Sequence, residues 1–149
     1  MRLIVRKTRR LSGSVTAPAS KSHTHRAGLA ASLAEGRSVM LNPLACDDTA
    51  ATIAACRLFG AEFAQSDRTE IIGTAGRPKV PKSDVHAGES GTTMRLMAGV
   101  AALCEGAATL TGGPSLCARP MEPLLRALAD LGAKRAKSLR NNGCPPVCI

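Results

Sequence analysis

The sequence has few aromatic residues and no long hydrophobic stretch. Of its 149 residues two are Phe, and neither Trp nor Tyr occurs. The longest stretch without a charged residue runs from Gly106 to Ala118 and includes Gly112, Gly113 and Pro114, whereas a transmembrane helix needs about 20 apolar residues. Residues 1–7 also lack the apolar segment of a secretory signal. We therefore expect a soluble, cytoplasmic protein whose core consists of aliphatic side chains.

Cysteine is present, but not in a pattern typical of metal sites or disulfide scaffolds. None of the six cysteines forms a Cys-x-x-Cys pair, and no histidine lies at zinc-ligand spacing from a cysteine pair. Without a secretory signal, reduced thiols that act as small apolar residues are the simplest interpretation. We expect no metal site.

Acidic residues are too few to balance the basic ones, and the net charge is +9. The excess lies near the two ends, since residues 1–37 contain eight Lys and Arg against Glu35 alone. Such an excess favours an anionic partner. Proteins that bind single-stranded nucleic acid also need aromatic rings that stack on bases, which this chain lacks. The composition therefore favours small phosphorylated molecules over nucleic acid.

The chain resembles itself at an offset of about 70 residues. Residues 32–36 (Ser-Leu-Ala-Glu-Gly) match residues 102–106 (Ala-Leu-Cys-Glu-Gly), and a later Leu-Phe-Gly-Ala at 58–61 matches Leu-Gly-Ala at 131–133. Both copies place a Ser-rich turn before an Ala-rich helix, then a β-rich stretch and a second helix. The pattern indicates a duplicated α/β unit, present in about two copies.

The expected elements follow from this pattern. We expect helices over 21–35, 49–58, 92–104 and 121–131, and strands over 3–7, 13–16, 38–42, 69–72, 107–111 and 133–136. Residues 140–143 are typical of a tight hairpin turn, and a further strand begins at 147–149. A sequence that stops there looks like the N-terminal part of a longer protein.

Three segments place hydroxyl and basic side chains at the start of a helix, where free backbone N–H groups and the helix dipole attract anions. The first contains Lys21, Ser22 and Arg26, with the last two on one helical face. The second, residues 88–95, is rich in glycine and hydroxyls, and the third puts Arg119 just before a helix. A capped helix with solvated charges is the simpler alternative for each segment alone. His23 and His25, on different faces of the first helix, are expected to have surface or packing roles.

Together these segments resemble one enzyme family. The motifs are Ser-Lys-Ser-x-Thr-x-Arg at 20–26, Gly-Glu-Ser-Gly-Thr-Thr-Met-Arg at 88–95, Arg-Pro-Met-x-Pro-Leu at 119–124 and Asn-Asn-Gly-x-Pro-Pro-Val at 141–147. In order and spacing they are similar to those of the 5-enolpyruvylshikimate-3-phosphate (EPSP) synthases. The resemblance covers essentially all of this chain and about the first third of a family member.

The resemblance implies a transferase that uses no metal and no organic cofactor. The family moves the enolpyruvyl (carboxyvinyl) group of phosphoenolpyruvate to the 5-hydroxyl of shikimate 3-phosphate and releases phosphate, in the shikimate pathway of aromatic amino acid biosynthesis. By motif match, Lys21 is catalytic and contacts both substrates, while Ser22 and Arg26 hold shikimate 3-phosphate. Gly91 and Arg119 contact phosphoenolpyruvate, whose place the inhibitor glyphosate takes. Further candidates at this site are Asp48, Glu89 and Thr92; a helix cap is an equal alternative for Asp48.

The resemblance also implies the domain organisation. The family fold is an inside-out α/β barrel with two domains, each built from three βαβαββ-type units. On that pattern residues 1–20 are strands of a second domain that is otherwise missing, and residues 21–149 are about two of the three units of the first substrate-binding domain. The family's principal catalytic carboxylate lies in the missing part. We therefore expect this chain alone to be inactive, and to self-associate through uncovered strand edges.

Two other functions fit part of the pattern. The sister enolpyruvyl transferases that act on UDP-N-acetylglucosamine carry Lys-Asn where this chain has Lys21-Ser22, and their reactive cysteine falls near Pro114, three residues from Cys117. A basic nucleic-acid-binding fragment would account for the charge but not for the lack of aromatic residues. The shikimate 3-phosphate assignment is therefore preferred.

Overall fold

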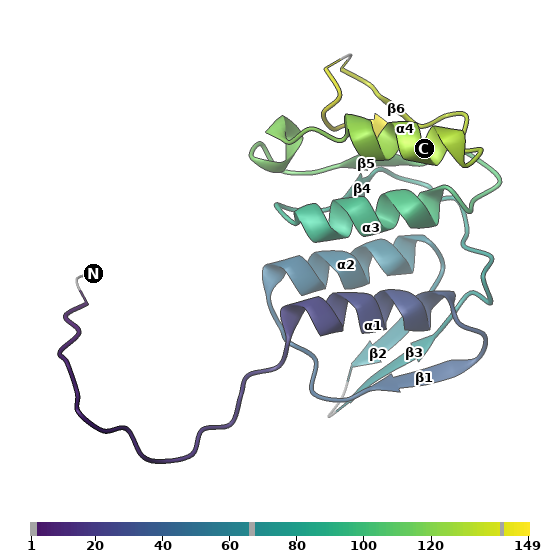
Figure 1. Cartoon of the computed structure of the whole chain (residues 1–149). Coiled ribbons are helices and arrows are strands. Elements are labelled where there is room, and N and C mark those ends of the chain that lie inside the picture. The colour runs from purple at the N-terminus through teal and green to yellow at the C-terminus, as the bar shows by residue number, and fades with distance from the viewer. Residues whose placement is uncertain (1–2, 66–67, 141) are drawn as a thin grey trace.

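The computed structural model describes residues 3–65, 68–140 and 142–149 (Figure 1). Within these residues the chain forms α-helices, one short 3₁₀-helix and two small sheets. The helices are α1 (Lys21–Leu33), α2 (Asp47–Leu58), α3 (Gly91–Ala101), η1 (Leu116–Ala118) and α4 (Glu122–Asp130). The strands are β1 (Arg37–Met40), β2 (Glu62–Gln65), β3 (Thr69–Ile72), β4 (Val85–His86), β5 (Thr109–Thr111), β6 (Lys137–Ser138) and β7 (Val147–Cys148).

The two sheets have related strand orders. The first is antiparallel with the order β1-β3-β2, and the second has the order β4-β5-β7-β6. In the second sheet β5 and β6 both pair antiparallel with β7, while β4 pairs parallel with β5. Strands β1, β3 and β2 therefore correspond to β5, β7 and β6. The order βαβαββ is complete in the second half, from β4 to β7, and lacks its first strand in the first half. The mixed α/β class and the duplicated unit predicted from the sequence are thus confirmed.

Matching residues start and end the helices of the two halves. Ser20 Oγ accepts a hydrogen bond from His23 N (3.3 Å) and caps α1, and Ser90 Oγ accepts one from Thr93 N (3.2 Å) and caps α3. Gly60 and Gly132 follow α2 and α4 with φ of 101° and 107°, a backbone conformation that a side chain disfavours. The repeated Ser and Gly positions of the sequence therefore mark equivalent helix ends.

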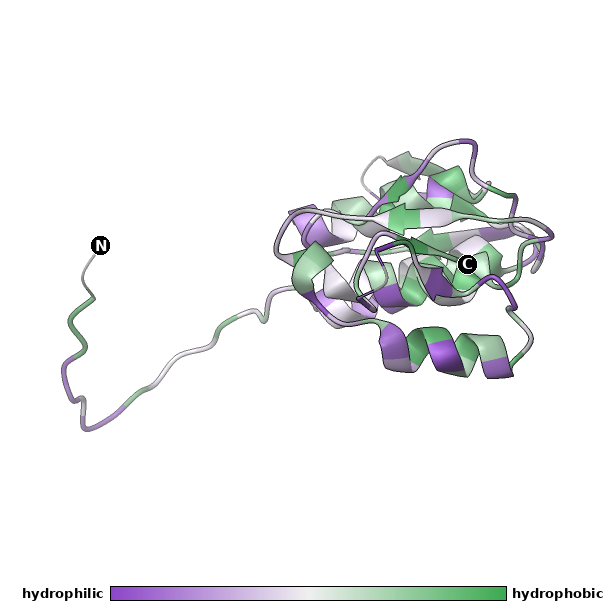
Figure 2. Ribbon diagram, turned by 90° about the horizontal axis from the view of Figure 1, so that it is seen from above, coloured by the Kyte–Doolittle hydropathy of each residue, from purple (hydrophilic) through white to green (hydrophobic). Residues whose placement is uncertain are grey.

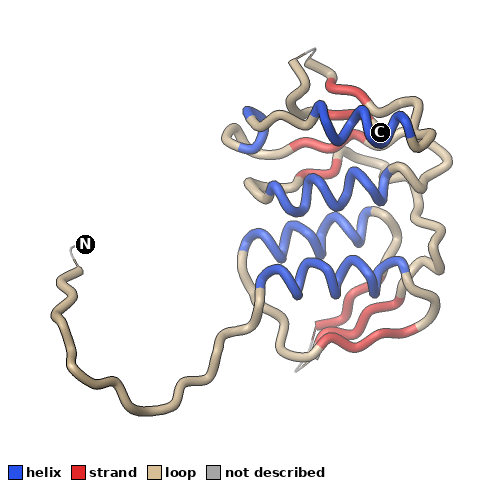
Figure 3. The backbone as a smooth tube through the Cα atoms, in the orientation of Figure 1, coloured by secondary structure: helices blue, strands red, loops and turns tan. Residues whose placement is uncertain are grey.

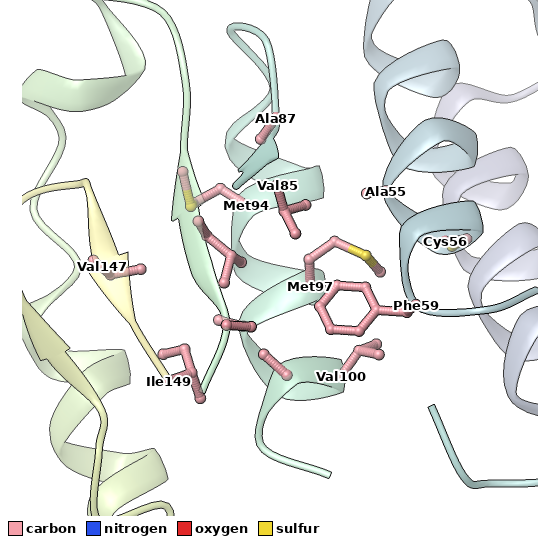
Figure 4. Close-up of a cluster of buried hydrophobic side chains, with 14 of the residues drawn as sticks. Ala55, Cys56, Phe59, Val85, Ala87, Met94, Met97, Val100, Val147 and Ile149 are labelled. Carbon is pink, nitrogen blue, oxygen red and sulfur yellow. The ribbon is translucent and has the colours of Figure 1, made fainter. Parts of the chain in front are cut away.

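One aliphatic core joins the two halves. Met97 and Phe59 meet between α3 and α2, while Val147 and Ile149 reach the same cluster from the other side (Figure 4). Met97, Ile71 and Leu110 are among its fully buried side chains. The core is mainly aliphatic, as predicted, but it also contains both phenylalanines of the chain, Phe59 and Phe63.

The two strands predicted before α1, over 3–7 and 13–16, are wrong for this structure. Residues 3–20 form neither helix nor strand, and Figures 1 and 2 show this segment leading away from the rest of the chain. Val15 is 96% exposed. An extended segment becomes a stable strand only when a neighbouring strand satisfies its backbone groups. No described strand lies beside this segment.

Other boundaries also differ from the prediction. Residues 133–136 form turns, with Ala136 N donating to Ala133 O (2.9 Å), and the strand begins only at β6. The short strands β2 and β4 were not predicted from the sequence. The hairpin turn predicted over 140–143 includes residue 141, which lies outside the described residues. None of the described helices has the length and hydropathy needed to cross a membrane.

Candidate active site

The helices α1 to α4 all begin at the same edge of the molecule (Figures 1 and 3). Each beta-rich segment crosses to that edge before the next helix starts, so the helices run in one direction. Free N–H groups and the positive dipole ends of the helices therefore face one side. An edge of this kind attracts anions before any side chain is considered.

Lys21 and Asp48 form an ion pair between the first turns of α1 and α2. Lys21 Nζ lies 2.8 Å from Asp48 Oδ2, and the Lys21 side chain is 51% exposed. The hydrogen bond with Asp48, followed by its charge, raises the pKa of Lys21 above the ordinary value. The N-cap residue of α2 is Cys46, so Asp48 is not its helix cap. Lys21 is thus a fixed, fully charged ammonium group that remains accessible.

Ser22 and Arg26 are both exposed on α1, one turn apart. Residues at this spacing lie on the same face of a helix. Thr92 is exposed on the first turn of α3. These side chains are open to a ligand at or near the edge where the helices begin.

Gly91 and Arg119 are brought into contact. A Cβ atom placed on Gly91 would lie 3.1 Å from Arg119 Nη1. Arg119 Nη2 also donates to Ser115 Oγ (3.4 Å), and Arg95 Nη2 donates to the carbonyl oxygen of Pro120 (3.3 Å). The absence of a side chain at Gly91 thus lets a guanidinium lie against the first turn of α3.

Glu89 joins the two loops that carry Gly91 and Arg119. Its Oε2 accepts a hydrogen bond from Leu116 N (2.7 Å), at the start of η1. A Cβ atom on Gly113 would overlap Glu89 Oε1, so the loop can approach only because residue 113 is glycine. Gly113 N also donates to Gly88 O (2.8 Å). The carboxylate of Glu89 is therefore engaged within the protein and holds the Arg119 segment.

Buried polar residues that the sequence did not single out lie behind this edge. Thr52 and Thr93 connect α2 to α3, and His25 connects α1 to α2. His25 is 1% exposed, so its predicted packing role is confirmed. Burial lowers the pKa of His25, which is therefore neutral at pH 7. Which threonines meet depends on how closely the helices pack, and no local sequence signal reports that.

The described residues contain no group of three or more His, Cys, Asp or Glu side chains that could hold a metal ion. Cys117 is buried, and its thiol lies 3.2 Å from the carbonyl oxygen of Gly112, within the protein. The site is therefore a set of cations, hydroxyls and helix ends.

Comparison with known proteins identifies the family. The family model of EPSP synthase (3-phosphoshikimate 1-carboxyvinyltransferase) matches residues 5–149. The chain belongs to the EPSP synthase family. A 3-phosphoshikimate 1-carboxyvinyltransferase from Methanothermobacter thermautotrophicus is 46% identical over 149 residues, which are 100% of this chain and 35% of that protein. One from Acetivibrio thermocellus is 44% identical over 150 residues, again 100% of this chain and 35% of that protein.

Solved structures agree with the family assignment. The EPSP synthase from Acinetobacter baumannii superposes with a TM-score of 0.85 at 33% identity, over 92% of this chain and 32% of that one. This chain thus spans about a third of the length of the EPSP synthases it matches. The membership predicted from the sequence is confirmed, and it disfavours both the UDP-N-acetylglucosamine transferase and the nucleic-acid-binding alternatives.

Proposed function

We propose that these 149 residues supply part of a carboxyvinyltransferase active site, at the edge where the helices begin. The reaction joins the carboxyvinyl group of phosphoenolpyruvate to the 5-hydroxyl of shikimate 3-phosphate and releases phosphate. The observation that carries the proposal is that Lys21 in the first turn of α1 and Arg119 against the first turn of α3 both lie at helix N-termini, in a chain of this family. Both substrates are polyanions, which such an edge attracts.

The positions of the side chains support the roles that the family resemblance implies. Ser22 and Arg26, exposed on one face of α1, bind shikimate 3-phosphate. Arg119, lying over Gly91, binds phosphoenolpyruvate, because a guanidinium can donate two hydrogen bonds to a phosphate or carboxylate. Thr92 lies near the same ligand, and Glu89 acts by holding the Arg119 loop.

Lys21 is proposed to serve the chemical step. The 5-hydroxyl oxygen bonds to the enol carbon of phosphoenolpyruvate while the neighbouring methylene takes up a proton and the hydroxyl proton is lost. The resulting tetrahedral species then loses phosphate and a methyl proton, which restores the double bond. A fixed ammonium at the junction of the two anions stabilises the charge that develops on the phosphate. Asp48 keeps that ammonium in place.

We also propose that the remaining wall of the cleft comes from the part of the family that has no counterpart in these residues. In this arrangement residues 1–20 join a second domain as strands, and residues 21–149 are about two of three units of the first domain. The exposed segment before α1 and the open edge at the helix N-termini support this division. The chain alone is then expected to bind its substrates weakly, to catalyse no turnover and to self-associate.

The test is a pair of titrations on the purified chain. Shikimate 3-phosphate and phosphoenolpyruvate are added separately, and binding is followed by backbone amide NMR shifts. We expect Arg26→Ala to weaken the binding of shikimate 3-phosphate, and Arg119→Ala to weaken the binding of phosphoenolpyruvate, each by about tenfold. Binding of single-stranded RNA with no response to either substrate would refute the proposal. Steady-state release of phosphate from both substrates would refute the incomplete-site part of it.

A further inference from the structure

A chain of buried hydrogen bonds connects the first three α-helices behind the proposed site. His25 Nδ1 on α1 lies 2.7 Å from Thr52 Oγ1 on α2, which lies 2.6 Å from Thr93 Oγ1 on α3. Thr93 Oγ1 in turn lies 2.8 Å from the Oγ of Ser90, the N-cap of α3. All of these residues are buried. The proposed substrate contacts include none of them.

The burial of His25 indicates which of its ring nitrogens carries the proton. Its Nε2 has no hydrogen-bond partner among the described residues, so one ring nitrogen stays unpaired in either tautomer. A buried N–H without an acceptor is rarer than an unpaired acceptor. The proton is therefore assigned to Nδ1, which donates to Thr52. Thr52 Oγ1 can then donate to Thr93 Oγ1 or to the carbonyl oxygen of Asp48, and Thr93 Oγ1 can donate to Ser90 Oγ or to that same carbonyl oxygen.

The end of this hydrogen-bond series that is farthest from His25 reaches residues next to the proposed site. Thr93 Oγ1 lies 3.2 Å from the backbone carbonyl oxygen of Asp48, whose side chain holds Lys21. It also contacts Ser90, which precedes Gly91. Thr52 Oγ1 itself lies 3.4 Å from the same carbonyl oxygen, so a change at Thr52 is one hydrogen bond from Asp48 and two from Ser90, which precedes Gly91.

We propose that His25 and Thr52 are positioning residues, which hold the first turns of α2 and α3 against α1 and so set the spacing of Lys21 and Gly91. The inference rests on the proposed function, because it concerns how that site is held. Buried hydrogen bonds between side chains of three helices favour the one arrangement of those helices in which the bonds can form. Apolar residues of the same shape at these positions would fill the space but would not fix the helix ends relative to one another.

The test compares two substitutions at one position. Thr52→Val keeps the shape of the side chain and removes the hydroxyl, whereas Thr52→Ser keeps the hydroxyl. We expect Thr52→Val to weaken the binding of both shikimate 3-phosphate and phosphoenolpyruvate about fivefold. The affinities of Thr52→Ser should stay within about twofold of those of the unchanged chain. The free energy of unfolding is measured for each variant. A loss of stability in Thr52→Val with unchanged affinities would overturn the proposal.

A measurement that needs no ligand can test the positioning role even if the proposed function is wrong. The Lys21 pKa, followed through the NMR shift of its ε-carbon, should return toward its ordinary value in Thr52→Val and stay raised in Thr52→Ser. If the unchanged chain bound neither substrate, the proposed function would fail, and the Lys21 pKa would still decide the positioning role. Equal pKa values in the two variants would overturn it. Should Thr52→Val not fold, His25→Asn and His25→Leu provide a second pair, because Asn retains a donor near the place of Nδ1.

Discussion

The space that a side chain on Gly91 would occupy lies next to the guanidinium of Arg119. The predicted contact of Gly91 with phosphoenolpyruvate therefore has a structural counterpart within the protein. A methyl group at this position would meet Arg119 Nη1 at 3.1 Å, and a flexible arginine can move away at little cost in stability. The effect of a substitution here should thus appear in ligand binding rather than in folding.

Gly91→Ala is accordingly expected to weaken phosphoenolpyruvate binding about tenfold, through a displaced Arg119, and to change the free energy of unfolding by less than about 1 kcal/mol. Gly99→Ala is the matched control, because Gly99 lies in the same helix and a Cβ there meets nothing within 4 Å. It should raise the free energy of unfolding by about 0.5–1 kcal/mol and leave affinity unchanged. Equal affinities of the two variants, measured by titration, would show that Gly91 does not position Arg119.

His25 gives the second prediction at this scale, a dependence of stability on pH. Burial, the largest cause, lowers the pKa of His25 in the folded chain below the ordinary value of 6.5. The unfolded chain therefore takes up a proton first as the pH falls, and the free energy of unfolding decreases from about pH 6.5 down to the folded pKa. Above pH 6.5 the contribution of His25 is fully present.

Urea unfolding at about pH 7.5 and about pH 5 measures this dependence. The difference between the two free energies should shrink in His25→Asn, which has no titrating ring. His23→Asn is the control, since His23 is exposed on the same helix. If His25→Asn and the unchanged chain lost the same free energy on acidification, His25 would not be the titrating group.

At the scale of elements, a side-chain hydrogen bond holds two loops of the candidate site together. The Arg119 segment is fixed because Glu89 accepts the N–H of Leu116 at the start of η1. Removing that acceptor leaves a partly buried donor unsatisfied, which costs about 1–3 kcal/mol. The role of Glu89 is thus separable from direct ligand contact.

Glu89→Ala is expected to lower the free energy of unfolding by about 1–2 kcal/mol and to weaken phosphoenolpyruvate binding. Glu89→Gln, which keeps an oxygen acceptor, should retain most of the stability and most of the affinity for phosphoenolpyruvate. Thermal unfolding and ligand titration of the two variants provide the comparison. A larger loss of affinity in Glu89→Gln than in Glu89→Ala would contradict the bridging role.

The sequence predicted the elements that local signals define. Ser20 and Ser90 before Ala-rich stretches, and Gly60 and Gly132 after helices, mark the helices correctly because capping is decided within a few residues. The sequence did not predict β2 and β4, which are short and exist through pairing with distant partners. The strand expected over 13–16 was wrong for a related reason: its local pattern is typical of a strand, but no described strand pairs with it.

In the candidate site, too, features set by local sequence could be predicted and features set by contacts between distant segments could not. The positions of Lys21 at the start of a helix, Arg26 one turn after Ser22 and Arg119 just before a helix could be predicted, because each follows from its own motif. That Lys21 binds Asp48, and that Gly91 faces Arg119, depends on how helices from different parts of the chain pack. The buried contact of Thr52 with Thr93 could not be foreseen, because threonine is common on exposed helix faces as well.

At the scale of the whole molecule, the small sheets leave strand edges uncovered. In the described part of the chain β1 is an outer strand of its sheet, and its Val39 is 47% exposed. An apolar groove lies beside it, lined by Ala27, Ala30 and Ala31 of α1, by Ala34 directly after that helix, and by residues 38–41. An open strand edge next to apolar surface is a template for pairing with another chain.

We therefore expect the chain to self-associate as its concentration rises, and the association to depend on this edge. Val39→Lys places a charge on the edge strand and should shift the association, followed by sedimentation equilibrium, to about tenfold higher concentration. Leu103→Lys is the control, because Leu103 is 55% exposed and follows α3 rather than lying on a strand. If the two variants associated alike, general loss of apolar surface would account for the effect, and the β1 edge would have no special part. A chain that stayed monomeric at every concentration would show instead that the two units, joined by one core, are sufficient as a folded body.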